Sequence, residues 1–379
     1  METKVNDLVL KGGRVVDPSQ GLDKVTDIAF ANGKVAAIGD NLAGKDTRTV
    51  TGKIVSPGLI DLHTHVYWGG TSLGVEAELV ARTGGVTTFI DAGSAGPGNF
   101  HGFRKHVIEP SPVRILPYLN VAFPGIFAFS KAVMVGENSD MRLIDAREAV
   151  RVAREHKDLV LGIKVRVGRS ASGDSGVKPL DIALDVAEEL GLPVMAHLDN
   201  PPPSRREVVD RLRPGDILTH CFRPFPNAPV RADGKVREEI LAARARGVVF
   251  DIGHGGGSFG FGTTRAMLAA GFLPDVISSD VHVISIEGPA FDLLTTMSKF
   301  LCLGVDLTTV IKLSTGNAAA AINRPDLGTL KVGAVGEATV IEEVSGTFDY
   351  ADSIGERMVG TKRLLSAGVV LAGRWWHPA

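Results

Sequence analysis

Short apolar runs alternate with helix-like stretches through the middle of the chain, and this alternation limits the folds open to it. Eight runs rich in Val, Ile and Leu occupy residues 54–65, 86–93, 115–122, 159–167, 192–200, 216–222, 248–255 and 275–282. Amphipathic stretches lie between them, such as residues 145–156, 180–191 and 236–247, of which the last two end at a glycine. Strand and helix alternating eight times predict an α/β fold, a (β/α)8 TIM barrel.

The two ends of the chain have a different pattern of apolar and turn residues. Residues 7–55 and the residues after about 325 form short apolar runs broken by turn residues, with Asn32-Gly33 as a hairpin signal. We expect these distant segments to meet in one small β-sandwich. The sequence therefore predicts a composite β domain of residues 1–55 plus 326–379, and a barrel domain of residues 56–325.

Composition excludes several classes of protein. The chain has 41 basic and 43 acidic residues, a net charge of −2, so it lacks the positive excess that binds nucleic acid or anionic lipid. It has neither an uninterrupted apolar run of about 18 residues nor the apolar segment of a signal peptide at its start. We expect a cytoplasmic protein that has neither nucleic acid nor a membrane as partner.

Polar residues gather at the ends of the predicted strands, where barrel enzymes carry their catalytic groups. The first run ends in His63-Thr64-His65, and alternation along a strand places both histidines on one face. Further polar residues close runs four, five, six and eight: Lys164, His197, His220 and Asp280. A single strand histidine is more often a hydrogen-bonded core residue, but the whole set predicts a metal site. These ligand types suit zinc first and leave iron and manganese open.

Lys164 stands among apolar neighbours in the run LVLGIKVRV. An ammonium group is costly to bury beside metal cations, so the pKa of this lysine should fall and the neutral amine should be favoured. A neutral lysine can add carbon dioxide, and the resulting carbamate can bridge two metals. The alternative is an ordinary lysine whose ammonium group reaches the barrel mouth or pairs with an acid.

These residues give the chain a resemblance to the amidohydrolase superfamily, in its dihydroorotase-like two-metal branch and closest to a subgroup of deacetylases. The resemblance covers essentially the whole chain and includes the segments PGLIDLHTH and GGVTTFIDAG. It implies that His63, His65 and Asp280 hold one divalent metal and that His197 and His220 hold a second. It further implies that carboxylated Lys164 and a hydroxide bridge both metals, and it points to a homo-oligomer.

The chemistry that this resemblance implies is hydrolysis. Two cations would supply hydroxide near neutral pH, and Asp280 would carry the proton to the leaving group. Deaminase relatives use one metal and an added glutamate near the histidines of strands five and six, but here these strands read MAHLDN and THCFRP. We predict deacetylation of a small O-acetyl or N-acetyl hydroxy or amino acid. A cyclic-amide hydrolase such as dihydroorotase and a non-catalytic barrel scaffold are the alternatives.

Three residues are candidates for substrate contact. Dihydroorotases typically have an arginine two residues after the histidine pair, where this chain has Tyr67, which either lines the mouth or packs in the core. Arg166 shares the inward face of its strand with Lys164, so it either anchors a substrate carboxylate or pairs with a loop acid. His254 either contacts substrate or anchors its loop. Residues 255–260 match a dinucleotide-binding pattern, but their place in the seventh of eight units favours an active-site loop.

Overall fold

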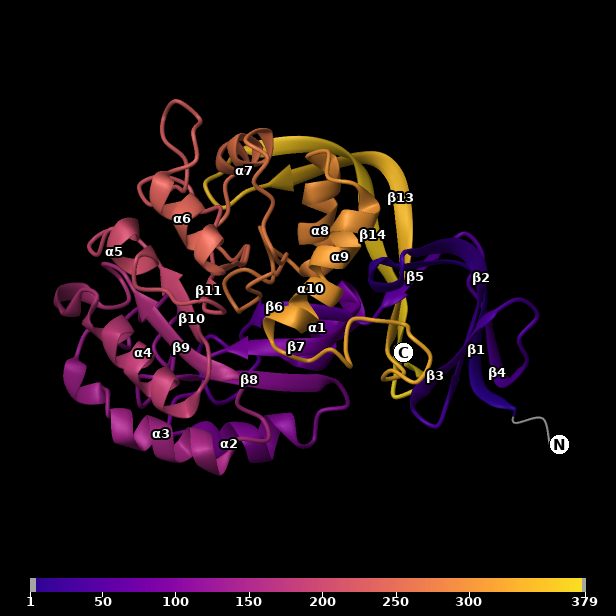
Figure 1. Cartoon of the computed structure of the whole chain (residues 1–379), viewed down its shortest axis with the longest axis horizontal. Coiled ribbons are helices and arrows are strands. Elements are labelled where there is room, and N and C mark those ends of the chain that lie inside the picture. The colour runs from indigo at the N-terminus through magenta and orange to yellow at the C-terminus, as the bar shows by residue number, and fades with distance from the viewer. Residues whose placement is uncertain (1–4, 377–379) are drawn as a thin grey trace.

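The computed structural model describes residues 5–376, and a parallel sheet forms its centre (Figure 1). Seven strands lie in this sheet in the order of the chain, each paired with the next. They are β6 (Leu59–Thr64), β7 (Val86–Ala92), β8 (Arg114–Asn120), β9 (Gly162–Val167), β10 (Val194–Leu198), β11 (Ile217–Leu218) and β12 (Val249–Phe250). Because consecutive strands are parallel neighbours, the carboxyl ends of all seven meet at one edge.

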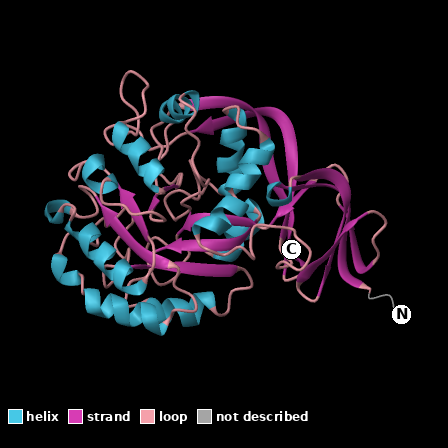
Figure 2. Cartoon of the chain, in the orientation of Figure 1, coloured by secondary structure: helices cyan, strands magenta, loops and turns pink. Residues whose placement is uncertain are grey.

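Helices lie between and after these strands in the chain (Figure 2). They are α1 (Ala77–Gly84), α2 (Phe100–Phe103), α3 (Ala146–Glu155), α4 (Lys178–Leu190), α5 (Arg205–Val209), α6 (Glu238–Arg246), α7 (Phe261–Ala269), α8 (Leu293–Cys302), α9 (Leu307–Leu313) and α10 (Gly316–Ala321). Helices α1 to α7 alternate with the strands, and α8 to α10 follow α7 without a named strand between them. The predicted glycine ends are confirmed, because Gly191 after α4 and Gly247 after α6 adopt the left-handed conformation that closes a helix.

The eighth predicted run, residues 275–282, does not form a regular strand. Single parallel bridges join it to the residue after β12, at Asp251 and Val276, and to β6, at Thr64 and Val281. Its polar side chains explain the irregularity. The carboxylate of Asp61 accepts hydrogen bonds from the backbone and hydroxyl of Ser279, and Asp280 has a φ of +49°. The segment therefore spans the two edge strands of the sheet without pairing along its length.

The first predicted run, residues 54–65, divides between two sheets. Its first half is β5 (Ile54–Pro57), which pairs with strands from both ends of the chain in a second sheet, and its second half is β6. Gly58 stands at the division, where a side chain would overlap the Thr87 hydroxyl. Close approach of the backbone to β7 at this point is what lets the chain pass from one sheet into the other.

The second sheet combines strands from both ends of the chain. Its eight strands run in the order β15-β14-β13-β5-β1-β2-β3, with β4 added beside β1. The strands not yet placed are β1 (Asn6–Asp17), β2 (Leu22–Ala31), β3 (Lys34–Gly39), β4 (Gly44–Thr49), β13 (Ala338–Ala351), β14 (Arg357–Leu371) and β15 (Arg374–Trp376). Asn32 and Gly33 form the predicted turn between β2 and β3, both with positive φ. The long hairpin of β13 and β14 arches from this sheet towards α7 (Figure 1).

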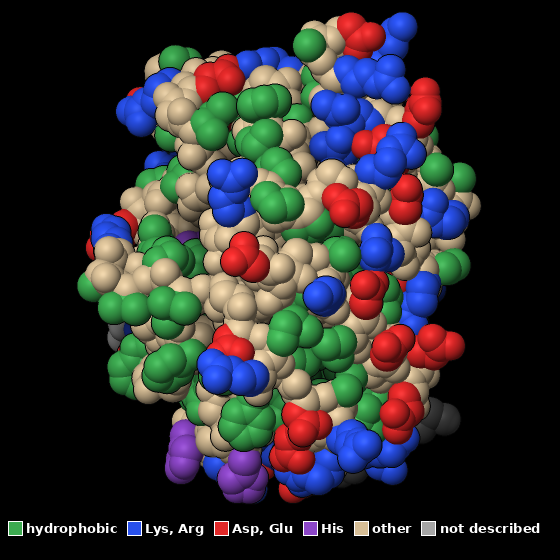
Figure 3. All heavy atoms as spheres, turned by 90° about the vertical axis from the view of Figure 1, so that its left-hand side faces the viewer, with side chains coloured by type: hydrophobic (Ala, Val, Ile, Leu, Met, Phe, Trp, Pro, Cys, Tyr) green, Lys and Arg blue, Asp and Glu red, His purple; other side chains and the backbone are tan. Residues whose placement is uncertain are grey.

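The surface mixes charges of both signs. On the face at the left of Figure 1, basic and acidic side chains alternate with hydrophobic ones, and neither sign fills the view (Figure 3). Within residues 5–376, every helix is too short or too polar to cross a lipid bilayer.

Candidate metal centre

The predicted metal ligands come together at the carboxyl edge of the parallel sheet. They lie in or directly after β6, β9, β10 and β11 and in the segment bridging the sheet edges: His63, His65, Lys164, His197, His220 and Asp280. The side chain of His197 is 13% exposed and the other five are more deeply buried. Burial lowers the pKa of all four histidines well below the usual value, so they are neutral and able to bind a cation.

Three of these residues form a compact group. The Nε2 atoms of His63 and His65 each lie 3.4 Å from the same carboxylate oxygen, Oδ1 of Asp280. One ligand atom from each of the three residues falls within 4.8 Å of the other two. Two neutral imidazoles and a carboxylate that face one point are a donor set for a divalent metal.

Hydroxyl groups orient both histidines of this group. Nδ1 of His63 lies 2.7 Å from the hydroxyl of Thr219, which itself donates to Asp251 at 2.7 Å. The hydroxyl proton is thus engaged, so His63 donates from Nδ1 and its Nε2 lone pair points at the centre. Nδ1 of His65 likewise lies 2.9 Å from the hydroxyl of Ser94. Such outer contacts fix the ring of a metal-binding histidine and its tautomer.

His197 and His220 form a second group. Nδ1 of His197 is 2.6 Å from Nε2 of His220, and the other nitrogen of His220 donates to the carbonyl of Gly253 at 2.7 Å. Nε2 of His197 is buried and has no hydrogen-bond partner among the described residues. The rings of His63 and His220 are 5.1 Å apart, centre to centre, so the two groups adjoin.

Lys164 has the environment that its neighbours predict. Its Nζ atom is fully buried and has no hydrogen-bond partner within residues 5–376. Burial lowers the pKa of this amine to about 7, with Asp280 opposing the shift and Arg166 adding to it. A buried amine without a partner is costly for a purely structural residue, and its neutral form is well populated near pH 7.

Backbone conformation brings the loop after β12 against this centre. Gly253 and Gly255 both have positive φ, and a side chain at either position would overlap a residue of the site. At Gly253 the overlap is with Thr219 and His220, and at Gly255 it is with the Oδ2 atom of Asp280. The loop of residues 253–260, which includes the predicted loop of residues 255–260, therefore packs against the candidate metal ligands, and only glycine fits at these two points of contact.

Arg166 lies beside the candidate metal centre, and its guanidinium contacts an aromatic ring and a carboxylate. It is 8% exposed, its guanidinium is 4.9 Å from the ring centre of Phe129, and its Nη1 is 3.3 Å from a carboxylate oxygen of buried Glu137. The expected alternative of a salt bridge to a loop acid is thus present. The positive charge of Arg166 also acts on the site, where it lowers the pKa of His65 and His197.

Tyr67 and His254 have the contacts of packed residues. The Tyr67 ring stacks on Phe103 at 4.5 Å, and its hydroxyl donates to the carbonyl of Asn99. His254 is fully buried, with Nε2 2.7 Å from the amine of Lys299 and Nδ1 2.9 Å from the carbonyl of Gly255. These contacts match core packing for Tyr67 and loop anchoring for His254, and they give no support to the prediction that either binds substrate.

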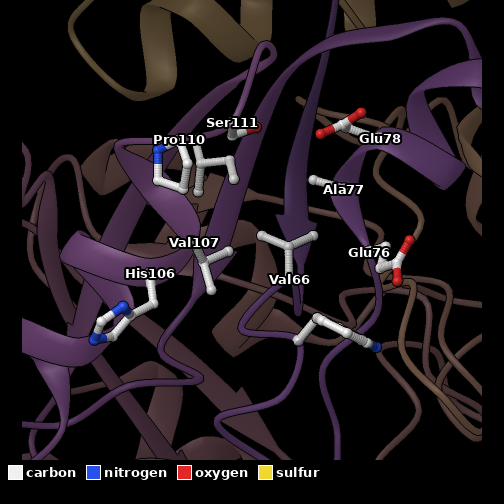
Figure 4. A pocket seen from close by; sticks show the side chains of 10 residues that line it. Val66, Glu76, Ala77, Glu78, His106, Val107, Pro110 and Ser111 are labelled. Atoms are coloured by element: carbon white, nitrogen blue, oxygen red, sulfur yellow. The ribbon is translucent and has the colours of Figure 1, made fainter. Parts of the chain in front are cut away.

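A pocket of about 260 Å³ lies behind the histidine pair, on the outer side of the strand end. Figure 4 shows Val66 between Val107 on one side and Glu76 on the other. Because successive side chains alternate, Val66 points away from the metal centre that His65 faces. The residues that line this pocket include none of the proposed metal ligands.

Sequence reasoning missed several residues that support the site. Thr219 and Asp251 orient His63 through two hydrogen bonds, and burial raises the pKa of Asp251 to about 6. Arg223, three residues after His220, donates to Ser258 in the loop after β12 at 2.9 Å and lowers the pKa of His197 and His220. Thr219 and Asp251 lie at the ends of predicted strands, and this position could have marked them as candidate site residues. Arg223 lies beyond a strand end, so the sequence gives no comparable indication for it.

Comparison with known proteins identifies the superfamily of the chain. The chain is 37% identical over 335 residues to a deacetylase of Agrobacterium fabrum. This alignment covers 87% of this chain and 82% of that protein. It is 30% identical to a deacetylase of Enterococcus faecalis, over 97% of this chain and 98% of the relative. The chain belongs to the amidohydrolase superfamily. No sequence-family profile matches it.

Solved structures extend the comparison within this superfamily. A crystal structure of a dihydroorotase matches with a TM-score of 0.89 and 34% identity, over 97% of both chains. A crystal structure of an adenine deaminase matches with a TM-score of 0.90 and 29% identity, over 98% of this chain and 99% of the other. The names of these relatives are those of hydrolytic enzymes, although they differ in substrate.

Proposed function

We propose that this amidohydrolase is a two-metal deacetylase that cleaves an acetyl group from a small O-acetyl or N-acetyl hydroxy or amino acid. The observation that carries the proposal is Lys164, a buried amine without a partner and with a pKa lowered to about 7, beside four neutral histidines and a carboxylate. The two relatives named deacetylase, which match most of the chain, support the choice of reaction.

The residues present fit two divalent metals, for which zinc suits the ligands best. His63, His65 and Asp280 would hold one and His197 and His220 the other, with Lys164 bridging both as a carbamate formed with carbon dioxide. The partnerless nitrogens of Lys164 and His197 are the atoms that such a centre would satisfy. Metals bound there would activate water and polarise the substrate carbonyl.

Asp280 is the proposed proton carrier. Its Oδ1 atom faces His63 and His65, while its Oδ2 atom lies against the backbone of Gly255 and 4.0 Å from Nδ1 of His220. In the metal-free protein, burial raises the pKa of this carboxyl well above the usual value. It would take a proton from the attacking water and pass it to the leaving oxygen or nitrogen.

We also infer the fold that the superfamily implies, a closed (β/α)8 barrel with a small β-sandwich beside it. The bridges from residues 276 and 281 to the two edge strands support closure of the sheet. The division into residues 1–55 plus 326–379 and residues 56–325 remains a prediction. So do a cytoplasmic location and a homo-oligomer.

The substrate is inferred to be an acid. Arg166 and Arg223 place two cationic groups beside His197 and His220, whose pKa values both arginines lower. A carboxylate on the substrate would be attracted by this charge and would share Arg166 with Glu137. A small acylated acid provides such a carboxylate next to the bond that is cleaved.

A cyclic-amide hydrolase is the second candidate, because a dihydroorotase structure is 34% identical over nearly the whole chain. Tyr67 argues against it, since this residue stands where dihydroorotases typically have a carboxylate-binding arginine and is packed on Phe103. The two candidates differ in the compound that is turned over, so a substrate panel separates them.

The test is a panel of N-acetyl and O-acetyl acids of both hands, with dihydroorotate beside them, assayed with zinc-loaded and metal-free protein. We expect zinc-dependent release of acetate from one group of acids. Hydrolysis of dihydroorotate with kcat/KM above about 10⁴ M⁻¹s⁻¹ would favour the cyclic-amide reading. Fewer than about 0.2 metal ions per chain after expression with zinc would contradict a metal-dependent hydrolase and favour the scaffold.

A further inference from the structure

A second buried lysine, Lys299 of α8, lies outside the metal ligands. Its side chain is fully buried, and its Nζ atom reaches three acceptors in three different segments. These are Nε2 of His254 at 2.7 Å, the carbonyl of Pro289 at 2.7 Å and the carbonyl of Ala351 at 2.9 Å. An ammonium group has three N–H donors, so this arrangement uses all of them. Lys299 thus joins the loop after β12, the segment after Asp280 and the end of β13.

His254 transmits one of these contacts to the active-site loop. Because its Nε2 atom accepts from Lys299, the proton of the neutral ring is on Nδ1, which donates to the carbonyl of Gly255 at 2.9 Å. The ring stacks on Phe259 with centres 4.5 Å apart. From the hairpin of β13 and β14, the hydroxyl of Ser353 lies 3.4 Å from the carbonyls of both His254 and Gly255. The carbonyls of His254 and Gly255 therefore both lie within hydrogen-bond distance of a side chain.

Gly255 in turn lies against the proposed proton carrier. Its φ is +51°, its N–H donates to the carbonyl of Ser279 at 2.9 Å, and a side chain here would overlap the Oδ2 atom of Asp280. Any rotation of the Gly255 peptide would therefore change the space open to this carboxylate. A continuous path of contacts runs from Lys299 through His254 and Gly255 to Asp280.

We propose that Lys299 is a positioning residue, which fixes the loop of residues 253–260 so that Gly255 keeps the Asp280 carboxylate in its working orientation. The proposal rests on the proposed function only for the role of Asp280 in proton transfer. An aliphatic residue would fill the same space without the cost of burying an amine, so packing alone does not account for a lysine here.

The test is Lys299→Met, which keeps the length of the side chain and removes its three donors. We expect amide hydrogen exchange at Gly255 to become at least about tenfold faster, because its loop loses the tie through His254. We also expect kcat to fall about 10- to 100-fold, with KM within about twofold and the metal content of the protein unchanged.

The matched control is Ser298→Ala, one residue earlier on the same helix and equally buried. The Ser298 hydroxyl donates to the carbonyl of Leu294 and accepts from the N–H of Leu364, and neither partner belongs to the active-site loop. This variant should lower thermal stability and leave both kcat and the exchange of Gly255 at the wild-type values. A purely structural role for Lys299 predicts the same pattern for Lys299→Met, and that pattern in a folded variant would overturn the proposal.

A second variant, His254→Phe, cuts the same path while keeping an aromatic ring on Phe259. Its effects on Gly255 exchange and on kcat should match those of Lys299→Met, and the double variant should be no worse than either single one. If Lys299→Met does not fold, unchanged exchange and kcat in His254→Phe would overturn the proposal. If wild-type protein hydrolyses no acylated acid, the proposed function is wrong. Amide hydrogen exchange at Gly255 and Asp280 in the variants still decides whether Lys299 positions these two residues.

Discussion

The two halves of the metal centre differ in the charge that the protein itself provides. The half formed by His63, His65 and Asp280 contains a carboxylate and two histidines, each oriented by a hydroxyl. In the half formed by His197 and His220, the Oδ2 atom of Asp199 lies 4.0 Å from Nε2 of His197 and accepts a hydrogen bond from the N–H of Ala171. The buried amine of Lys164 has no hydrogen-bond partner among the described residues. The first half can bind a divalent cation with the side chains it has. The second has two histidines and a carboxylate that is hydrogen-bonded to the backbone, and carboxylation of Lys164 would add an anion to it.

Lys164→Ala should have the largest effect, because it removes the amine that is proposed to carry the carbamate. Without the carbamate the second half loses the anion that carboxylation of Lys164 would supply, so we expect activity to be abolished and the metal content to fall from about two ions per chain to about one. Short carboxylic acids that fill the space should restore part of the activity. The control is Val165→Ala, on the outward face of the same strand and equally buried. A Lys164→Ala protein that keeps two metals and full turnover would contradict the bridging role.

Asp280→Asn tests the first half. The amide keeps the shape of the side chain but accepts a proton poorly, so we expect kcat to fall by at least about 10³-fold. The histidine pair and the second half remain, so at least one metal should stay bound. Turnover within tenfold of wild type would remove Asp280 from proton transfer, and metal analysis of the same sample shows whether the loss comes from ligation instead.

Arg166→Met probes the space beside the second half. Loss of a charge-assisted hydrogen bond should raise KM for acetylated acids about 10- to 100-fold and leave a neutral acetyl ester nearly unaffected. The variant also leaves Glu137 buried without its cation, so a lower melting temperature is expected and does not decide the question. Equal effects on the charged and neutral substrates would show that Arg166 serves the protein and not the substrate.

Thr219→Val tests the first half by removing the hydroxyl that orients His63. Loss of such an outer contact weakens metal binding about 10-fold or more, and chelator competition measures it. Thr315→Val is the control, because its hydroxyl is equally buried but donates to the carbonyl of Ile311, on its own helical turn. Equal zinc affinity in the two variants would mean that Thr219 does not orient His63.

The smallest expected effect is a pH dependence of carbon dioxide uptake. Burial lowers the pKa of Lys164 to about 7, so the reactive neutral amine is scarce below this pH and abundant above it. Between pH 6 and pH 8 the neutral fraction rises about tenfold, and labelling by carbon dioxide at fixed dissolved concentration should rise with it in metal-free protein. Labelling that falls as the pH rises would contradict the lowered pKa.

Local patterns in the sequence predict the strand ends well and the long-range contacts poorly. Alternation along β6 and β9 places His63, His65 and Lys164 on inward faces without knowledge of any distant contact. The contacts of Lys299 with His254, Pro289 and Ala351 depend on tertiary packing, and no spacing within α8 indicates them. The sequence also does not decide whether Arg166 binds substrate or pairs with a loop acid, because its contact with Glu137 depends on tertiary packing as well.

The irregular eighth segment shows the same limit in the fold. Residues 275–282 have the composition of a strand, but Asp61 and Asp251 form hydrogen bonds with its serines and bend it away from regular pairing. Likewise, the division of residues 54–65 at Gly58 depends on contact with Thr87 of another strand. In both places side chains distant in sequence override the local preference.

The central claim, that the second half of the centre depends on carboxylated Lys164, is tested most directly by ¹³C NMR of protein loaded with zinc in the presence of ¹³C-labelled carbon dioxide. We expect one labelled carbamate carbon per chain in the wild type and none in Lys164→Ala. Fully metal-loaded, active wild-type protein without a labelled carbamate would contradict it.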